Sequence, residues 1–262
     1  MGKVKEFIID DSTPDHKYMP TDFGRGWDGS EMGEHPYAGM QAAKPFPDEL
    51  LIPEHEWQAR IQEQEETQST PKHLFQRAGG VCKNQFRTSL CWSFAAVVGV
   101  EITEIIQGRS YRKLSPASTA CLITNFQNVG GWSRKFIEVS ADKGICASED
   151  WPDIDVTNRA LNTTENRQKA LECRPTEWYY LPPRSHKHMV SAVLRRKVVP
   201  SGYNWWGHAV CVVRLIWRNG TAVPEIINSW GEGFGVNGYG TLEGSKMYAD
   251  DATTVHTITA SG

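Results

Sequence analysis

A long apolar run from Cys91 to Gln107 constrains the fold of this chain more than any other segment. The run contains no proline, and Gly99 is its only residue that strongly disfavours a helix. Apolar side chains would lie on almost every side of a helix formed here, which is typical of a helix buried within a core. Gly108 supplies a natural end. We therefore expect a central, buried helix that begins at Cys91.

Cys91 lies in the first turn of this helix, six residues after Gln85. Unpaired backbone N–H groups and the helix dipole favour negative charge at that position, so we expect a lowered pKa and a reactive thiolate. The alternative is a buried core cysteine, which is the commoner role of a single cysteine. The position of Cys91 thus makes it a candidate nucleophile.

Composition excludes several classes of protein. The chain has 262 residues, of which 39% are hydrophobic, enough for one large core or two modest lobes. A net charge of −3, from 28 basic and 31 acidic residues, predicts neither nucleic acid nor an anionic membrane as a partner. No stretch approaches the roughly 20 apolar residues of a membrane span, and the N-terminus lacks an apolar signal segment. We expect a protein made without secretion, acting on small neutral or peptide-like ligands.

The cysteines and histidines predict neither a metal site nor a cofactor. Six cysteines occur singly, without a Cys-x-x-Cys pair, at positions 82, 91, 121, 146, 173 and 211. Such spacing favours reduced core residues, although Cys82, Cys146 and Cys173 remain candidates for pairing in an oxidising setting. His186 and His188 lack a neighbouring cluster of ligands, so a solvated turn is the better interpretation.

The first 70 residues differ from the remainder and predict an N-terminal arm. Residues 9–49 have neither helical nor strand periodicity, whereas Trp57 and Ile61 form an apolar stripe on an expected helix at 54–62. Three interpretations remain open: a segment that lies across an active cleft and silences it, an arm that docks onto another protein, and a plain surface extension.

The rest of the chain predicts two lobes of different character. Helical patterns dominate from residue 71 to about 175, and strand patterns dominate from about 176 to 262. A three-residue loop at 218–220 would place Trp217 opposite Thr221. The same register puts His208 and Asn228 on one face of a hairpin as diagonal neighbours, whereas a two-residue turn alone would move Asn228 to the other face.

Three blocks of this sequence resemble the signatures of papain-like cysteine proteases, in the order of that family. The resemblance covers roughly residues 71–245 and rests on Asn84-Gln85 with Cys91-Trp92-Ser93-Phe94, on Gly207-His208-Ala209-Val210, and on Asn228-Ser229-Trp230-Gly231 with Gly235 and Gly238-Tyr239-Gly240. It implies an α+β fold of two lobes, with a helical lobe built on the helix from Cys91 and an antiparallel, barrel-like β lobe.

The resemblance also implies the roles of individual residues. Cys91 would be the nucleophile, paired as thiolate with an imidazolium of His208, and Asn228 would orient the imidazole. Trp230 would shield that hydrogen bond, and Gln85 would donate to the oxyanion. The substrate would pair with the backbone of Gly130 and Gly131, and Trp132 would wall the main specificity pocket. The implied activity is a cysteine endopeptidase acting on a peptide or protein substrate.

Departures from the family pattern keep other functions open. Phe86 and Leu90 stand where the family usually has glycine and serine, and we expect both to narrow the cleft. Residues 1–70 lack the long helical motifs of family prosegments. A papain-fold scaffold of a virus or phage particle, docked through this arm, is therefore the main alternative, and acyl transfer to an amine is a third. The expected location is cytoplasmic or within such a particle.

Overall fold

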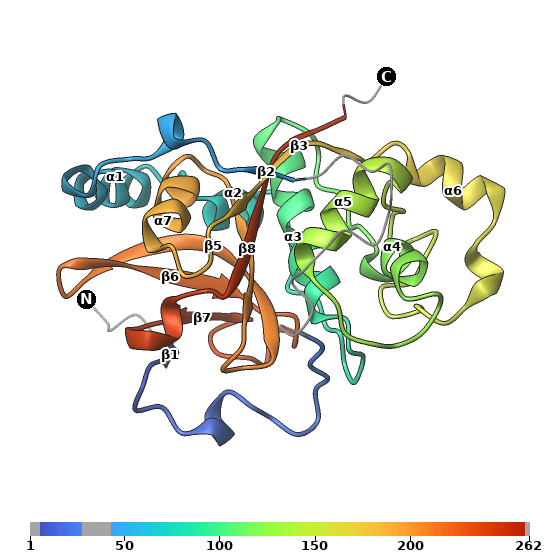
Figure 1. Ribbon diagram of the computed structural model, residues 1–262, viewed down its shortest axis with the longest axis horizontal. Helices are drawn as coiled ribbons and strands as arrows, with labels where there is room; N and C mark the ends of the chain where they lie inside the picture. Colours follow the sequence, from blue (N-terminus) through green and yellow to red (C-terminus); the bar gives the residue numbers. More distant parts are fainter. Residues whose placement is uncertain (1–5, 28–42, 260–262) are drawn as a thin grey trace.

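The computed structural model describes residues 6–27 and 43–259, and it divides into a β lobe and a helical lobe. Figure 1 shows the strands with α1 and α7 on one side, and α4, α5 and α6 on the other. Between them runs α3 (Cys91–Ile106), which packs against strands of one lobe and helices of the other. Every residue from Cys91 to Glu104 is buried, which confirms the predicted central helix.

The helical lobe follows the helical patterns of the sequence. Besides α3 it contains α4 (Pro116–Ile123), α5 (Ser133–Lys143) and α6 (Thr164–Ala170), while α2 (Pro71–Arg77) packs against α3 and the sheet. Side-chain caps begin several of these helices. Ser115 accepts a hydrogen bond from the Ser118 N–H at the start of α4, for example.

The strands form one open, mixed sheet of eight in the order β1-β7-β6-β5-β4-β8-β3-β2. The six central strands pair with one another in antiparallel fashion: β3 (Pro175–Leu181), β4 (Val199–Tyr203), β5 (His208–Arg218), β6 (Thr221–Ile227), β7 (Tyr239–Leu242) and β8 (Asp251–Ile258). Helix α7 (His186–Leu194) packs against β5 and β4.

Both edge strands come from the N-terminal arm and run parallel to their neighbours. Strand β1 (Ile8–Ile9) pairs with β7, and β2 (Lys44–Pro45) pairs with β3. The expected helix of the arm is present as α1 (Glu54–Glu66), with Trp57 and Ile61 buried against the β lobe. The described part of the arm therefore adds both edge strands to the sheet. The expected boundary between residues 1–70 and the peptidase domain stays a prediction.

The hairpin of β5 and β6 corrects the predicted turn. Arg218 pairs with Thr221 across the two-residue turn Asn219-Gly220, so the three-residue loop was wrong. A bulge between Val212 and Arg214 then shifts the register by one, and Cys211 pairs with Ile227. This bulge restores the predicted register at the far end of the hairpin, where His208 and Asn228 lie.

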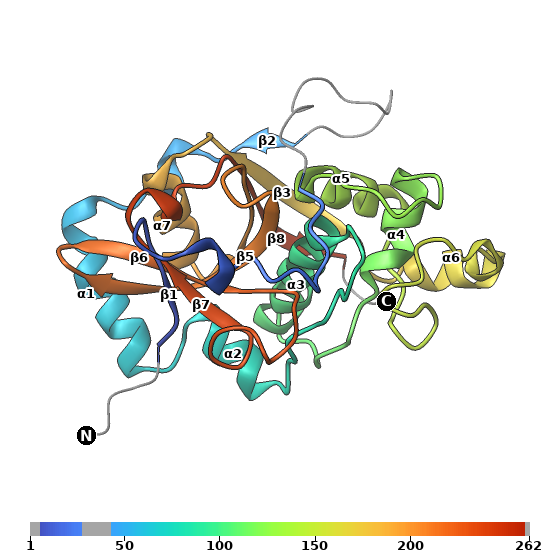
Figure 2. The same ribbon diagram turned by 90° about the horizontal axis from the view of Figure 1, so that it is seen from below.

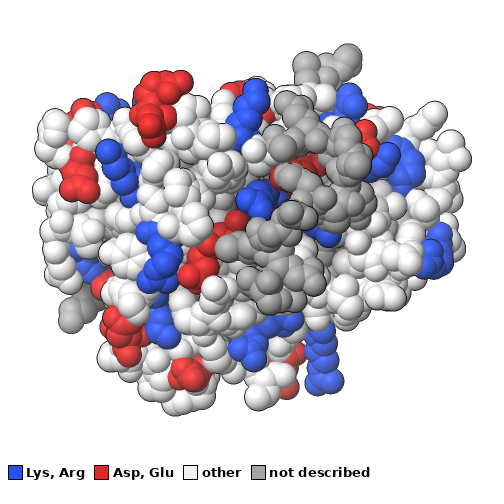
Figure 3. Space-filling view, viewed as in Figure 1, with Lys and Arg blue, Asp and Glu red and all other residues white. Residues whose placement is uncertain are grey.

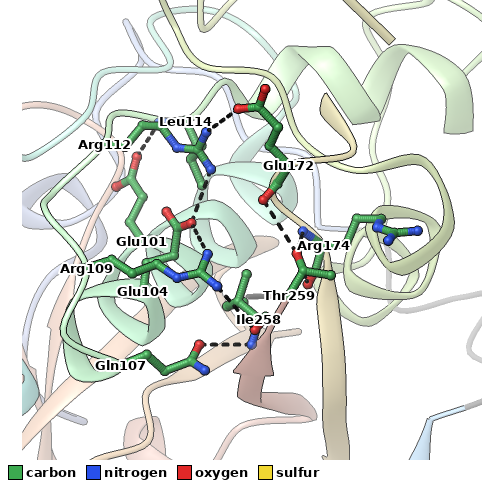
Figure 4. Close-up of polar contacts among 10 residues, drawn as sticks. All are labelled: Glu101, Glu104, Gln107, Arg109, Arg112, Leu114, Glu172, Arg174, Ile258 and Thr259. Atoms are coloured by element: carbon green, nitrogen blue, oxygen red, sulfur yellow. Dashed lines mark hydrogen bonds and ion pairs between the residues drawn. The ribbon is translucent and has the colours of Figure 1, made fainter. Parts of the chain in front are cut away.

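A polar network ties the end of α3 to the final strand (Figure 4). The Glu104 carboxylate forms ion pairs with Arg109 at 3.0 Å and with Arg112 at 3.2 Å. The Gln107 side chain accepts a hydrogen bond from the Ile258 N–H at 2.9 Å. The central helix is thus fixed at its carboxyl end, far from Cys91.

Charged side chains show no separation by sign on the face drawn in Figure 3, where basic and acidic groups alternate. None of the helices in the described part of the chain combines the length and the apolar character needed to cross a bilayer.

Candidate active site

Cys91 is the first residue of α3 and its side chain is fully buried. Burial raises the pKa of the Cys91 thiol to about 11, and nearby backbone N–H groups, those of Ala209 and Gly26 first, offset only part of that rise. The expectation of a lowered pKa is therefore wrong for this state of the molecule. The reason is desolvation, because an N-terminal segment covers the sulfur.

His208 opens strand β5 and is held by Asn228, which directly follows β6. The His208 Nε2 lies 2.7 Å from the Asn228 Oδ1, within a buried pair. Because an amide oxygen only accepts hydrogen bonds, Nε2 carries the proton and Nδ1 has a lone pair. Nδ1 is buried and has no hydrogen-bond partner among the described residues. The ring is therefore oriented with one nitrogen left to accept a proton.

Two tryptophans enclose the His208 ring. Trp230 stacks on it with ring centroids 4.4 Å apart, and Trp206 meets it at 4.9 Å and a steep angle. This desolvation lowers the pKa of His208 to about 3. The hydrogen bond to Asn228 raises the pKa in part, whereas the positive charge of Arg25 lowers it further. Trp230 thus has the shielding position that the resemblance implies.

The start of α3 and the start of β5 meet at the sulfur. Ala209, the residue after His208, presents its backbone N–H to the Cys91 thiol. Cys91 and Ala209 also lie in the same buried cluster. The structure therefore pairs His208 with Asn228 and places the residue after His208 against Cys91, at the seam between the lobes.

Gln85 lies on a segment that pairs with the loop carrying Asn228. The Gln85 N–H donates to the Ser229 carbonyl at 2.8 Å, and the Ser229 hydroxyl donates to the Gln85 Oε1. With its side-chain oxygen engaged in this way, Gln85 presents Nε2 as a donor, to the Thr88 carbonyl at 2.7 Å and to the Gly24 carbonyl at 2.9 Å. The sequence gave no sign that Ser229 would orient this amide.

The segment from Asp22 to Trp27, which we call the cleft segment, lies over these residues. The Gly26 N–H donates to the Cys91 Sγ at 3.2 Å. The Gly24 carbonyl accepts from Gln85 and also from the Trp230 indole at 3.2 Å. In Figure 2 the N-terminal chain passes beside the start of α3. Of the three interpretations of the arm, the described contacts agree with the one that places it across the cleft.

Glycine is required in the cleft segment because it approaches the chain before α3 so closely. A Cβ at position 24 would lie 1.9 Å from the Thr88 carbonyl oxygen, and one at position 26 would lie 1.9 Å from that of Ser89. Real Cβ atoms never approach a backbone oxygen so closely, so any side chain here would displace the segment. The two glycines of the motif Phe23-Gly24-Arg25-Gly26-Trp27 are the sequence signal for this contact.

The predicted glycine pair faces the cleft segment. The Gly131 N–H donates to the Gly26 carbonyl at 2.9 Å, and Trp27 forms a parallel bridge with Gly131. A Cβ at Gly130 would lie 2.5 Å from the same carbonyl oxygen. Trp132 is half-buried at the start of α5, against the core of the helical lobe. Gly131 therefore already pairs with an extended chain, while the role of Trp132 stays a prediction.

The two bulky departures from the family pattern differ in position. Leu90 is fully buried in the helical lobe, so the expectation that it narrows the cleft is wrong. Phe86 keeps 54% of its surface exposed beside Gln85.

All six cysteines are free, and no group of three potential ligands within the described ranges lies close enough to hold a metal ion.

Comparison with known proteins adds one finding. No family model and no curated protein matches this chain. Among solved structures, the digestive procathepsin L 3 of the Tenebrio molitor larval midgut matches with a TM-score of 0.59 and 20% identity, over 68% of this chain and 66% of that one. The Amb a 11 cysteine protease, a major ragweed pollen allergen, matches in its proform with a TM-score of 0.57 and 18% identity, over 70% and 65%.

This chain thus spans just under two thirds of the length of those two structures. At such low identity the likeness concerns the fold, and neither source supports the viral origin considered above. It confirms the α+β class and the two-lobed architecture expected from the sequence. The chain has a papain-like fold, shared with cysteine proteases solved in their proforms.

Proposed function

We propose that this chain is a cysteine peptidase in which Cys91 attacks the peptide carbonyl and His208 transfers the proton. The hydrogen bond between His208 Nε2 and Asn228 Oδ1 is the observation that carries this proposal. It leaves Nδ1 as the basic nitrogen of a residue whose neighbour, Ala209, presents its backbone N–H to the Cys91 sulfur at the N-terminus of α3. A cysteine and an oriented imidazole at such a position form the usual pair for nucleophilic catalysis.

The reaction follows from these positions. His208 Nδ1 takes the proton of the Cys91 thiol, and the sulfur adds to the carbonyl carbon of the substrate. The imidazolium then gives its proton to the leaving amine as the C–N bond breaks. Water attacks the resulting thioester, loses its proton to His208 and releases the acid, which restores the thiol. Asn228 keeps the ring in the required orientation throughout.

Gln85 stabilises the negative oxygen of the tetrahedral intermediate. Its Nε2 donates to the Gly24 carbonyl, which shows that the amide can donate to a peptide oxygen near Cys91. The Cys91 backbone N–H is the expected second donor. Loss of one such donor typically lowers the rate by about 10²–10³.

The cleft segment holds the enzyme silent in this state. Gly24 and Gly26 occupy the donors of Gln85 and Gly131 that a substrate would use, and Gly26 contacts the sulfur itself. Burial also keeps Cys91 and His208 neutral, since it raises the pKa of Cys91 and lowers that of His208, and the charge of Arg25 in this segment lowers the pKa of His208 further. The two matched structures, a procathepsin and a proform, agree with this interpretation.

Two alternative functions remain to be tested. A papain-fold scaffold would keep the architecture without turnover, and an acyltransferase would use the same residues with an amine as acceptor. A protein partner of residues 1–70 and a cytoplasmic or particle-borne location also remain predictions. No contact among the described residues favours them over hydrolysis.

The decisive experiment is the Cys91→Ala substitution. We expect peptide hydrolysis to fall by up to about 10⁶, to the background rate, because the nucleophile is absent. Labelling by an irreversible epoxide reagent should disappear as well. Both are measured on the full chain and in the Gly26→Ala background, where the cleft segment is displaced.

Cys146→Ser is the matched control, because Cys146 is a buried thiol of the helical lobe outside the site. It should keep both hydrolysis and labelling. Turnover that survives in Cys91→Ala would refute the proposal. A large assembly that neither hydrolyses peptides nor reacts at Cys91 would favour the scaffold instead.

A further inference from the structure

Phe86, the residue after Gln85, combines an unfavourable backbone with an exposed aromatic ring. Its φ is +51°, a conformation that glycine adopts freely and bulky side chains rarely adopt. The Asn84 side chain accepts the Phe86 N–H at 2.8 Å and fixes this turn. The ring remains 54% exposed and so contributes little to the core. Backbone strain that the fold does not need is concentrated at functional positions.

The Phe86 ring lines a largely apolar hollow of about 590 Å³ beside the candidate active site. Ile154 lines it from the helical lobe and is itself 38% exposed. Thr88 and Asn128 contribute further walls, and Asp22 and Arg87 bring one charge of each sign. This lining suits a large uncharged side chain.

The arm already presents an aromatic residue to this hollow. Phe23, in the cleft segment, lines it and stacks on Trp230 with ring centroids 5.7 Å apart. Phe23 immediately precedes Gly24, whose carbonyl accepts from the Gln85 amide. The hollow therefore lies within one residue of the position where the carbonyl under attack would bind.

The contacts of the arm also indicate which half of a substrate reaches the hollow. Gly26, on one side of Gly24, accepts a hydrogen bond from the Gly131 N–H. Phe23, on the other side, packs on Trp230, which stacks on His208. His208 gives its proton to the leaving amine, so this second side holds the leaving half.

We propose that Phe86 and Ile154 form a specificity pocket for a large apolar side chain on the leaving side of the scissile bond. Phe23 occupies the edge of this pocket in the covered state, and a substrate side chain takes its place when the cleft segment moves away. Burial of an apolar group against an aromatic ring supplies the preference. The inference rests on the proposed peptidase function.

The test compares substrates that differ only after the scissile bond. In the full chain with Gly26→Ala, kcat/KM is measured for peptides with Phe, Leu or Ser at the two positions after that bond. We expect Phe86→Gly to lower the ratio of Phe or Leu over Ser by about tenfold. Phe86→Leu should retain most of the ratio, and Ile154→Ser should lower it. Preferences before the scissile bond should not change.

Leu171→Ala is the matched control, because Leu171 is a comparably exposed apolar residue, 43% accessible, after α6. It should leave the ratio unchanged. If Phe86→Gly hydrolyses peptides with a Phe or Leu over Ser ratio within twofold of the parent, the pocket is refuted and the peptidase function is retained. Absence of any Cys91-dependent hydrolysis, in the parent and in Gly26→Ala, would overturn both.

Discussion

Two parts of the N-terminal arm bind the molecule in different ways. The cleft segment, Asp22 to Trp27, is held through backbone atoms of Gly24 and Gly26 and through two aromatic side chains, Phe23 stacked on Trp230 and the buried Trp27, whose indole donates to Asn204 at 2.9 Å. The second part, residues 44–66, is held by apolar side chains. Phe46, Ile52, Trp57 and Ile61 are all at most 6% exposed within the core of the β lobe.

This difference indicates that one part of the arm fixes it to the β lobe and the other covers the site. Burial of an apolar side chain stabilises by about 1.5–3 kcal/mol, whereas a single hydrogen bond contributes about 0.5–1.5 kcal/mol. The residues at 44–66 therefore fix the arm to the β lobe. The cleft segment buries one large apolar side chain, Trp27, against four in residues 44–66, so we expect it to be held more weakly and to leave the site first.

The largest effect is expected at the anchor. Trp57→Ala should lower the free energy of unfolding by about 3–5 kcal/mol, because a buried indole that donates to the Ile52 carbonyl at 2.9 Å is lost. Urea denaturation measures the change. Gln58→Ala, on the exposed face of the same helix, should stay within about 0.5 kcal/mol of the parent. A loss below 1 kcal/mol in Trp57→Ala would remove the distinction between the two parts.

A smaller effect on stability, but a clear one on reactivity, is expected in the cleft segment. Gly26→Ala should raise the rate of Cys91 labelling about tenfold, which corresponds to about 1.4 kcal/mol, because its Cβ would collide with the Ser89 carbonyl. The free energy of unfolding should fall by at most about the same 1.4 kcal/mol, because only the covered state of the folded protein loses this contact.

Gly233→Ala is the control for that substitution, because a Cβ there meets nothing within 4 Å. It should label at the parent rate. If Gly26→Ala labels no faster than Gly233→Ala, the cleft segment does not limit access to the sulfur. The segment would then be a structural part of the fold.

A third effect is expected from pH. Desolvation lowers the pKa of His208 to about 3, so the unfolded chain, with a pKa near 6.5, binds more protons than the folded one between these values. Stability should therefore be full above about pH 6.5 and decline as the pH falls. Desolvation also lowers the pKa of His256, which lies beside Phe46 of the anchor, to about 3. Burial raises the pKa of Asp251, and this opposes the decline in stability.

Melting temperatures from pH 7 to pH 4 measure this dependence. His208→Gln and His256→Gln should each flatten it, the first by acting under the cleft segment and the second beside the anchor. Equal slopes in the parent and in both variants would show that neither histidine remains neutral in the folded protein.

The sequence predicted local features well and contacts between distant segments poorly. The helix from Cys91 was readable because its apolar run leaves no polar face. The predicted register between His208 and Asn228 was correct although the predicted turn was wrong. The turn at Asn219-Gly220 is one residue shorter than predicted, and a bulge at Val213 compensates for the difference. Ser229 and the glycines of the cleft segment escaped notice because their roles depend on chain that lies 60 to 200 residues away.

The placement of β1 and β2 decides how this protein can be switched on. Each covers an outer edge of the sheet, alongside β7 and β3. Cutting the chain before Pro71 would expose two rows of unpaired amides and carbonyls, a template for strand addition between molecules. If the proposed peptidase is activated without such strand addition, we therefore expect the cleft segment to leave while β1 and β2 stay in the sheet.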